Sequence, residues 1–551
     1  MNERINHKTQ KIEEEMDSLM KGVEIPKPKY MKYIKQNDLQ LKNYSNLKSF
    51  IPPMKQLFDI SNEEITFDND FIIKNIEEKN GIYYLNKDKE VYLKVTHLMD
   101  PIKVAQEKND EMKIQNPWNQ AYVETLASYI FGKLRSENIT PHFNLFYGAF
   151  SSIAKTYNFN ITDEVESYRM YRWFWNNIEQ NKIKINVDGE DKEQVKEIYD
   201  EIMVKPEYCL DNKENDCDEI EELKSFGIKE SDDLESIESL NSIKTQSTND
   251  SDDSGDSDDS GDSDDSDEYK VYAQFENFPV MMIFTEKNTS TLDDLLEDYD
   301  EVGSKPNTKD WEEKWSAWLF QIIAALCVGQ TILGFTHNDL HSNNIVWDNT
   351  NVKFLYYKTN DNKIFKVPTY GKLFKIIDFG RSIFSINEHL FVSDDFCEGN
   401  DAATQYNFPP LSKPDASTSE PLVYPNPSFD LARLAISIFE SIFPDIDTFP
   451  IQKKDGMILN PNDTNPRKET NSDLFNLLWS WLVDIEGKNI LYDDNFDERF
   501  PDFDLYVHIA SSCRNCIPKE QIYKKPFRKF LINSVNIPKS IMDVKKYNLY
   551  V

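Results

Sequence analysis

Two short stretches of the sequence carry residue types that suit phosphoryl transfer. The first, at residues 335–347, reads Phe-Thr-His-Asn-Asp-Leu-His-Ser-Asn-Asn-Ile-Val-Trp and contains Asp339 and Asn344. The second, at residues 375–380, reads Lys-Ile-Ile-Asp-Phe-Gly and contains Asp378. Phosphoryl transfer needs an oriented hydroxyl group and a divalent metal that neutralises phosphate charge. One loop carboxylate, one amide oxygen and a second carboxylate would meet that need.

In this order and spacing, the two stretches resemble the catalytic loop and the Asp-Phe-Gly motif of the protein-kinase superfamily. The resemblance implies that Asp339 is the general base or hydroxyl-orienting residue, and that Asn344 and Asp378 are magnesium ligands. His337 would brace the loop. Asp430, at the start of a predicted helix, resembles the buried kinase aspartate that anchors this loop, although an ordinary helix N-cap is an equally good interpretation.

The resemblance extends to the first half of the chain, where Lys94 lies in the β-type run Val-Tyr-Leu-Lys-Val. Lys94 is similar to the strand lysine that binds the α- and β-phosphates of ATP, and Glu124 to the helix glutamate that pairs with it. Residues 283–286 resemble the hinge whose backbone would bind adenine. The implied cofactors are ATP and Mg²⁺, and the implied nucleotide-binding residues are Lys94, Thr285, Glu286, Asn344 and Asp378. The implied catalytic residues are Asp339, Lys94 and Glu124.

Several positions depart from the kinase pattern. Gly81 is the only glycine of residues 72–85, where a Gly-x-Gly-x-x-Gly loop would cover the phosphates. Tyr92 stands where kinases usually have alanine beside adenine. Asn338 replaces the usual arginine of the catalytic loop, which suggests the hypothesis that activity does not require a phosphorylated activation segment.

The acceptor class is left open by His341, which stands where serine/threonine kinases have lysine. Histidine there resembles haspin-like kinases and small-molecule phosphotransferases of the aminoglycoside and choline type. The favoured function is a serine/threonine-protein kinase that transfers the γ-phosphate of ATP to a protein hydroxyl. The alternatives are a kinase-like enzyme acting on a small molecule and a catalytically silent scaffold. The chain also resembles putative serine/threonine kinases of giant DNA viruses, which implies an intracellular location in host cytoplasm or in the virion.

Strand patterns precede helix patterns, which predicts an α+β fold with a β-rich lobe followed by a helical lobe. The resemblance to kinases implies that these form a two-lobed, protein-kinase-like fold. We expect an N-terminal extension at 1–60, a β-rich lobe at 61–286 and a helical lobe at 287–551. Short β-type runs predict strands at 71–73, 82–85, 91–95, 269–275 and 280–284. Apolar stripes predict helices at 123–134, 315–326, 429–443 and 473–485, and the long gap between Asp339 and Asp378 predicts an enlarged hairpin around 360–370. Residues 290–296 resemble the helix that follows the hinge in kinases.

An acidic segment interrupts the first lobe. Residues 211–268 contain 23 Asp or Glu against 4 Lys and no Arg, a balance of 4 − 23 = −19 within the whole-chain charge of −35. Like charges at this density cannot form a core, so we predict that the segment is disordered within an insertion at about 155–268. It could bind a basic partner, and closing so long a loop is inexpensive.

Bulk properties exclude some classes of function. An acidic chain lacks the clustered Lys and Arg that nucleic-acid backbones require, so DNA or RNA binding is not expected. No apolar run of membrane-spanning length is apparent, and the N-terminus lacks the apolar stretch of a secretory signal. We expect the six cysteines, including the single Cys-x-x-Cys at Cys513 and Cys516, to be reduced thiols.

Overall fold

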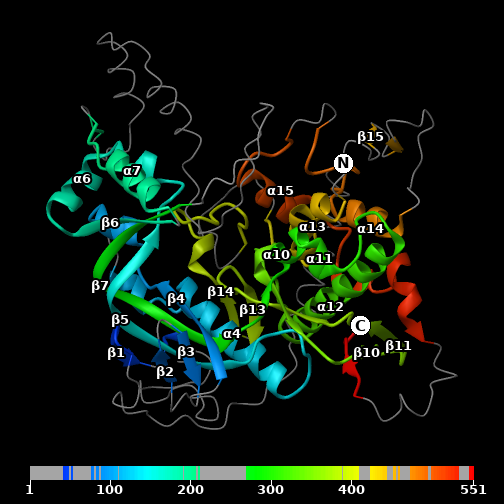
Figure 1. Ribbon diagram of the computed structural model, residues 1–551. Coiled ribbons are helices and arrows are strands. Elements are labelled where there is room, and N and C mark those ends of the chain that lie inside the picture. The colour runs from blue at the N-terminus through cyan, green and yellow to red at the C-terminus, as the bar shows by residue number, and fades with distance from the viewer. Residues whose placement is uncertain are drawn as a thin grey trace.

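A β-rich part and a helical part lie side by side in the computed structural model (Figure 1). The structure describes residues 41–48, 51–53, 76–79, 82–85, 89–108, 111–189, 191–206, 209–210, 269–386, 389–408, 422–443, 451–453, 457–459, 472–493, 498–532 and 545–551. The strand predicted at 71–73 and the acidic segment 211–268 lie outside the described residues, so neither prediction is tested.

The β-rich part is built on one antiparallel sheet in the order β1-β5-β7-β4-β3-β2, with β6 paired to a further stretch of β7. Its strands are β1 (Tyr44–Lys48), β2 (Ile76–Lys79), β3 (Ile82–Leu85), β4 (Lys89–His97), β5 (Phe146–Asn160), β6 (Ile183–Asp188) and β7 (Lys270–Glu286). The strands predicted at 82–85 and 91–95 are therefore confirmed. The sheet also includes β1, from the stretch expected to be an extension outside the lobe.

The prediction of two strands at 269–275 and 280–284 is wrong, because β7 is continuous over 17 residues. Asn277 lies between the two predicted strands with a φ of 54°, and the side chain of Phe278 next to it is buried. The chain stays extended because β5 pairs with both halves, from Asn160 opposite Tyr272 to Gly148 opposite Phe284. Pairing with β5 thus outweighs the weak strand propensity of Asn277 and Pro279.

The two faces of this sheet face different cores because alternate side chains of a strand point in opposite directions. Met281 and Ile283 of β7 join the core that includes α4 (Gln120–Ser136) and the helical part. Met282 and Phe284 join a second core under the smaller helices. Those helices are α3 (Pro101–Ala105), α5 (Val165–Arg169), α6 (Arg172–Glu179) and α7 (Lys192–Ile202). The described part of the expected insertion at 155–268 thus contributes α5, α6, β6 and α7.

The helical part is centred on α12 (Lys309–Leu333), which is surrounded by shorter helices. These are α10 (Leu292–Glu297), α11 (Tyr299–Val302), α13 (Phe429–Ile442), α14 (Asp473–Trp481), α15 (Asp504–Ser512) and α16 (Pro518–Gln521). The helices expected at 123–134, 315–326 and 429–443 are confirmed. The helix expected at 473–485 ends at Trp481. The chain then turns back at Gly487, whose φ is 83°, and Val483 forms a β-bridge with Asn489.

Small sheets also lie in this part, which is less purely helical than expected. One joins β12 (Lys372–Ile376), β9 (Ile345–Asn349) and β8 (Ser290–Thr291); another joins β17 (Leu531–Ile532), β11 (Ile364–Pro368), β10 (Phe354–Lys358) and β18 (Tyr547–Asn548). Two hairpins are formed by β13 (Ile383–Ile386) with β14 (His389–Val392) and by β15 (Ile451–Lys453) with β16 (Met457–Leu459). The hairpin of β10 and β11 is the enlargement predicted between Asp339 and Asp378, and the architecture as a whole is α+β.

The central helix α12 corrects the expectation about apolar runs. By length and composition it could cross a membrane, and it is the one described helix of which this is true. Almost all of its most apolar stretch is buried inside the protein, including Trp315, Trp318 and Ile323. This burial accounts for its apolarity as that of a core helix.

Candidate active site

Lys94 connects two carboxylates from distant parts of the chain. It lies on β4, and its Nζ is 2.7 Å from Oε1 of Glu124 and 2.7 Å from Oδ2 of Asp378. The two carboxylates hold the pKa of the Lys94 ammonium above its usual value in spite of burial. Although burial acts to raise the pKa of Asp378, the nearby Lys94 lowers it overall, whereas burial dominates at Glu124 and raises its pKa to about 7.

The helix α4 is held firmly where it presents Glu124. At Gly132 an added Cβ would lie 2.6 Å from Cβ of Phe146 on β5, so only glycine permits this close approach of helix and strand. At the other end of α4, the backbone nitrogen of Gln120 donates a 2.9 Å hydrogen bond to Oδ1 of Asp394. Asp394 follows Asp378 in the chain, so α4 and the segment after the Asp-Phe-Gly motif are linked directly.

Asp430 anchors the backbone of the loop that carries Asp339. Oδ1 of this fully buried carboxylate accepts hydrogen bonds from the backbone nitrogens of His337, at 3.0 Å, and Asn338, at 2.9 Å. Ser428 is the N-cap of α13, so Asp430 lies inside the helix and the N-cap interpretation is wrong. The geometry matches the anchoring alternative.

The ring of His337 also stabilises this loop through two hydrogen bonds. Its Nε2 donates to the carbonyl oxygen of Ile377 at 2.8 Å, and its Nδ1 accepts from the backbone nitrogen of Asp339 at 3.3 Å. One nitrogen donating and one accepting defines a neutral ring, and burial lowers the pKa of His337 accordingly. The hydrogen bond from His337 to Ile377 holds Ile377, the residue before Asp378, beside the loop that carries Asp339.

Asp339 has a cationic and hydrogen-bonding environment. Its Oδ1 accepts a 2.9 Å hydrogen bond from the hydroxyl of Tyr506, and its Oδ2 lies 3.7 Å from Nη1 of Arg381. Burial alone would raise the pKa of Asp339, but Arg381 and nearby cationic groups lower it to about 2. The carboxylate is therefore ionised at neutral pH and can accept a hydrogen bond from a hydroxyl group.

Asn344 lies next to the same loop with its amide oxygen available. Its Nδ2 donates to the carbonyl oxygen of Asp339 at 2.9 Å and lies 2.9 Å from Nε2 of His341, which accepts. The backbone carbonyl of Asn344 accepts from Ile377 at 3.0 Å, which holds it beside Asp378. Among the described residues, the amide oxygen of Asn344 accepts no hydrogen bond.

The donor set fits magnesium. Mg²⁺ prefers oxygen ligands and is commonly held by one or two protein groups together with substrate phosphates. The amide oxygen of Asn344 and the carboxylate of Asp378, which is 38% exposed, satisfy this description. The described residues contain no cluster of three or more His, Cys, Asp or Glu side chains that would form an all-protein metal site.

Asn338, which stands where kinases have the loop arginine, takes part in hydrogen bonds between uncharged groups. Asn338 adopts a φ of 65°, donates from Nδ2 to the carbonyl oxygen of Arg381 at 2.9 Å, and accepts from the hydroxyl of Tyr406 at 2.6 Å. Arg381, directly after the Asp-Phe-Gly motif, supplies the buried cation and pairs through Nε with Asp395 at 2.9 Å. The hypothesis that activity needs no phosphorylation remains a prediction.

The hinge candidates lie at the end of β7. Thr285 is paired with Tyr92 of β4 on one side and with Phe146 of β5 on the other. Glu286 is bonded within the protein: its backbone nitrogen donates to Leu145, and its carboxylate lies 2.8 Å from Nζ of Lys375. Tyr92 is 53% exposed on the strand that carries Lys94, so a large ring stands where alanine would be usual. Gly81 lies outside the described residues.

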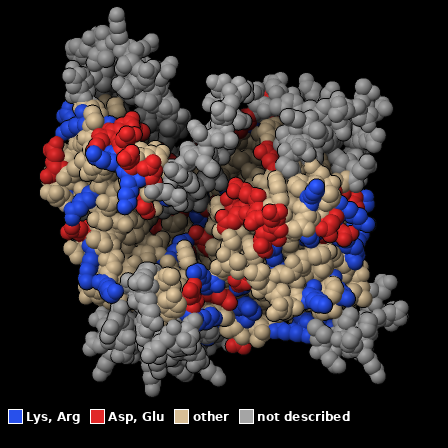
Figure 2. All heavy atoms as spheres, viewed as in Figure 1, with Lys and Arg blue, Asp and Glu red and all other residues tan. Residues whose placement is uncertain are grey.

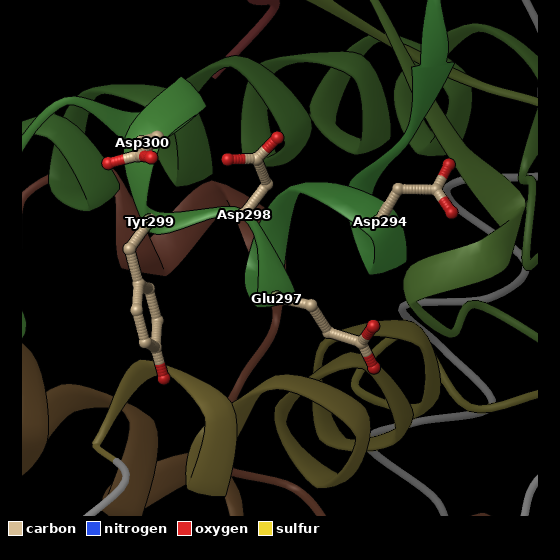
Figure 3. A pocket seen from close by; sticks show the side chains of 5 residues that line it. All are labelled: Asp294, Glu297, Asp298, Tyr299 and Asp300. Atoms are coloured by element: carbon tan, nitrogen blue, oxygen red, sulfur yellow. The ribbon is translucent and has the colours of Figure 1, made fainter. Parts of the chain in front are cut away.

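An acidic hollow lies on α10 and α11. Figure 2 shows Asp and Glu gathered on this face, and Figure 3 shows the residues that line the hollow, namely Asp294, Glu297, Asp298, Tyr299 and Asp300. Part of the charge has a local explanation, because Asp294 forms a capping box with Thr291 and Asp298 caps α11. None of the predicted site residues lines the hollow.

The site residues Arg381, Asp395 and Tyr506 were not predicted from the sequence. Arg381 had a detectable signal, since it follows the Asp-Phe-Gly motif directly. Asp395 and Tyr506 had none, because their partners lie 14 and 167 residues away along the chain.

No protein-family model matches this chain. Among curated proteins, a segment is similar to serine/threonine-protein kinase haspin of Mus musculus, with 43% identity over 61 residues. The match covers 11% of this chain and 8% of the mouse protein. A short segment of the chain is therefore similar to a kinase, and the comparison does not extend to the whole of either protein.

Proposed function

We propose that the chain is an ATP- and magnesium-dependent phosphotransferase with a two-lobed, protein-kinase-like fold. The observation that carries this proposal is the position of Lys94, whose ammonium lies within 2.7 Å of both Glu124 and Asp378. The similarity of one segment to a serine/threonine kinase points to the same class.

Each residue has a role in this proposal that follows from its contacts. Lys94, oriented by Glu124, would bind the phosphates of ATP. The backbone nitrogen of Glu286 is bonded to Leu145 and so would not bind the base. Asn344 and Asp378 would hold Mg²⁺, which when bound neutralises charge on the phosphates. Asp339 would accept the hydrogen bond of the acceptor hydroxyl and orient it for in-line attack.

The acceptor we favour is a serine or threonine hydroxyl of a protein, in keeping with the haspin similarity. A small-molecule acceptor is the second candidate because of His341, which is buried and hydrogen-bonded to Asn344 and stands where serine/threonine kinases have lysine. Purified protein with labelled ATP, Mg²⁺ and either generic proteins or amino-sugar and choline acceptors would distinguish the two. The acidic hollow on α10 and α11 would favour basic acceptors in either case.

Two substitutions test the proposed roles. Asp378→Ala should abolish transfer and magnesium-dependent ATP binding, because it removes a ligand. Asp339→Ala should slow transfer by about 10²- to 10⁴-fold but keep ATP affinity, because it removes only the group that orients the hydroxyl. Equal loss of ATP affinity in both variants would contradict these roles.

The matched control is Asp200→Ala, an exposed carboxylate on α7 away from the site. This variant should transfer phosphate and bind ATP like the unaltered chain. ATP binding that is indifferent to Asp378→Ala, together with no transfer to any acceptor, would favour a silent scaffold instead.

A further inference from the structure

The helix α15 brings a tyrosine to the proposed base. The hydroxyl of Tyr506 donates a 2.9 Å hydrogen bond to Oδ1 of Asp339, although 167 residues separate the two along the chain. The other oxygen of Asp339, Oδ2, lies 3.7 Å from Nη1 of Arg381, which is longer than a hydrogen bond. One oxygen is therefore held, and the other can still accept a hydrogen bond.

Tyr506 is itself held in place by several contacts. Nε of Arg433 donates a 2.7 Å hydrogen bond to the tyrosine hydroxyl, and the guanidinium carbon lies 5.2 Å from the ring centroid. Phe503, the N-cap residue of the helix that carries Tyr506, stacks its ring on the ring of Tyr506 with a centroid distance of 5.2 Å and an interplanar angle of 12°. The hydroxyl that donates to Asp339 is thus pre-oriented by a buried cation and by packing.

A single helix, α13, supports both the backbone and the side chain of the loop. Asp430 accepts from the backbone of the loop, and Arg433, three residues later on the same face, orients Tyr506. Backbone and carboxylate are therefore fixed relative to the same rigid element. Such rigid support is what a group that must meet a reacting hydroxyl requires.

We propose that Tyr506 is a positioning residue, which holds Oδ1 of Asp339 so that Oδ2 faces the acceptor hydroxyl. This inference rests on the proposed function, because it assigns the carboxylate its orientation in that reaction. The opposite role for a hydroxyl bonded to a base is to occupy the place of the acceptor hydroxyl and so block transfer. The two roles predict opposite changes in rate.

The substitution Tyr506→Phe removes the hydroxyl and keeps the ring that stacks on Phe503. We expect kcat to fall roughly 10- to 100-fold at saturating ATP, because a misdirected carboxylate orients the acceptor poorly. The KM for ATP should change less than about twofold, because Lys94 and Asp378 remain in place. Tyr523→Phe is the control, since that ring packs on Phe365 in the β10–β11 region, and its kcat should be unchanged.

A double-mutant cycle separates positioning from a general structural effect. In an Asp339→Ala background there is no carboxylate to orient, so adding Tyr506→Phe should lower the residual rate by less than about twofold. A similar loss in both backgrounds would overturn the inference, since it would mean that Tyr506 acts independently of Asp339. A faster rate in Tyr506→Phe would overturn it in favour of the blocking role.

Failure of the inference is distinct from failure of the proposed function. If the unaltered chain transfers phosphate and Asp378→Ala does not, an unchanged kcat in Tyr506→Phe overturns the role of Tyr506 alone. If the unaltered chain transfers phosphate to no acceptor, the proposed function fails and the inference fails with it.

Discussion

Arg381 is the residue around which the charges of the candidate site are arranged. It is buried and contacts two carboxylates, Asp395 through Nε at 2.9 Å and Asp339 through Nη1 at 3.7 Å. A buried cation is costly unless it is paired, so each carboxylate lowers the cost of keeping Arg381 inside. In return, Arg381 keeps Asp339 ionised.

We therefore expect Asp395→Asn to destabilise the protein. Removing one partner of a buried ion pair usually costs about 3–5 kcal/mol, and the nearby Asp339 should place this variant at the lower end. Unfolding in urea, followed by tryptophan fluorescence, would measure the change. Asp200→Asn, at an exposed position, serves as the control, and an equal midpoint for the two variants would contradict the importance of the pair.

The loop after α4 illustrates how elements of the two parts are joined. Its His142 is fully buried; Nδ1 donates to the carbonyl oxygen of Phe374 on β12 at 2.8 Å, and Nε2 accepts from the hydroxyl of Tyr357 on β10 at 2.7 Å. The neighbouring Phe143 forms a β-bridge with Ile376. The loop is thus held between the strand that leads to Asp378 and the enlarged hairpin.

His142 makes the stability of this junction depend on pH. Burial lowers its pKa to about 3, whereas in the unfolded chain it takes up a proton near pH 6.5. The stability that neutral His142 contributes is therefore present above about pH 6.5 and is lost as the pH falls toward 3, with a slope of at most about 1.4 kcal/mol per pH unit.

The test compares unfolding free energies at pH 7 and pH 5 in the unaltered chain and in His142→Gln. The loss between the two pH values should be smaller in the variant by about 2 kcal/mol, because glutamine does not titrate. His389→Gln, which replaces an exposed histidine on β14, should behave like the unaltered chain. Identical losses in all three proteins would show that His142 is not the responsible group.

On the scale of the whole molecule, the last described residues add an edge strand, β18, to the sheet of the β10–β11 hairpin beside α12. β18 pairs in parallel with β10, and Leu549 is fully buried, with its backbone nitrogen donating to Lys358 at 2.9 Å. The carbonyl oxygen of Val551 accepts from the backbone of Asn360 at 2.9 Å. Sheet, hairpin and central helix are therefore packed as one unit.

Leu549→Ala should consequently destabilise the fold by about 2–5 kcal/mol, the usual cost of such a truncation in a core. Because Leu549 lies beside β10 and its backbone is bonded to Lys358 rather than to a proposed site residue, transfer measured at 25 °C should persist. Val352→Ala is the control: Val352 is 51% exposed near the same sheet, and its replacement should change stability by less than about 0.5 kcal/mol. Equal stability of both variants would contradict the role of the C-terminal strand.

Elements and motifs that depend on neighbouring residues could be predicted from the sequence. The apolar stripe of α4, the buried face of α12 and the alternation of β4 follow from helical and strand periodicity, so their positions could be predicted. The order of the two loop motifs identified Asp339, Asn344 and Asp378 as candidates. Each stripe and each motif lies within one short stretch of the chain.

Only the tertiary structure decided which distant groups meet. Nothing near Tyr506 or Asp395 in the sequence indicates that they would face Asp339 and Arg381, because α15 and the segment after Asp378 reach them through packing. The continuity of β7 and the recruitment of β1 likewise depend on pairing with β5 rather than on local propensity. The sequence by itself therefore determined which side chains could do chemistry, whereas their partners and orientations depend on contacts between segments far apart in the chain.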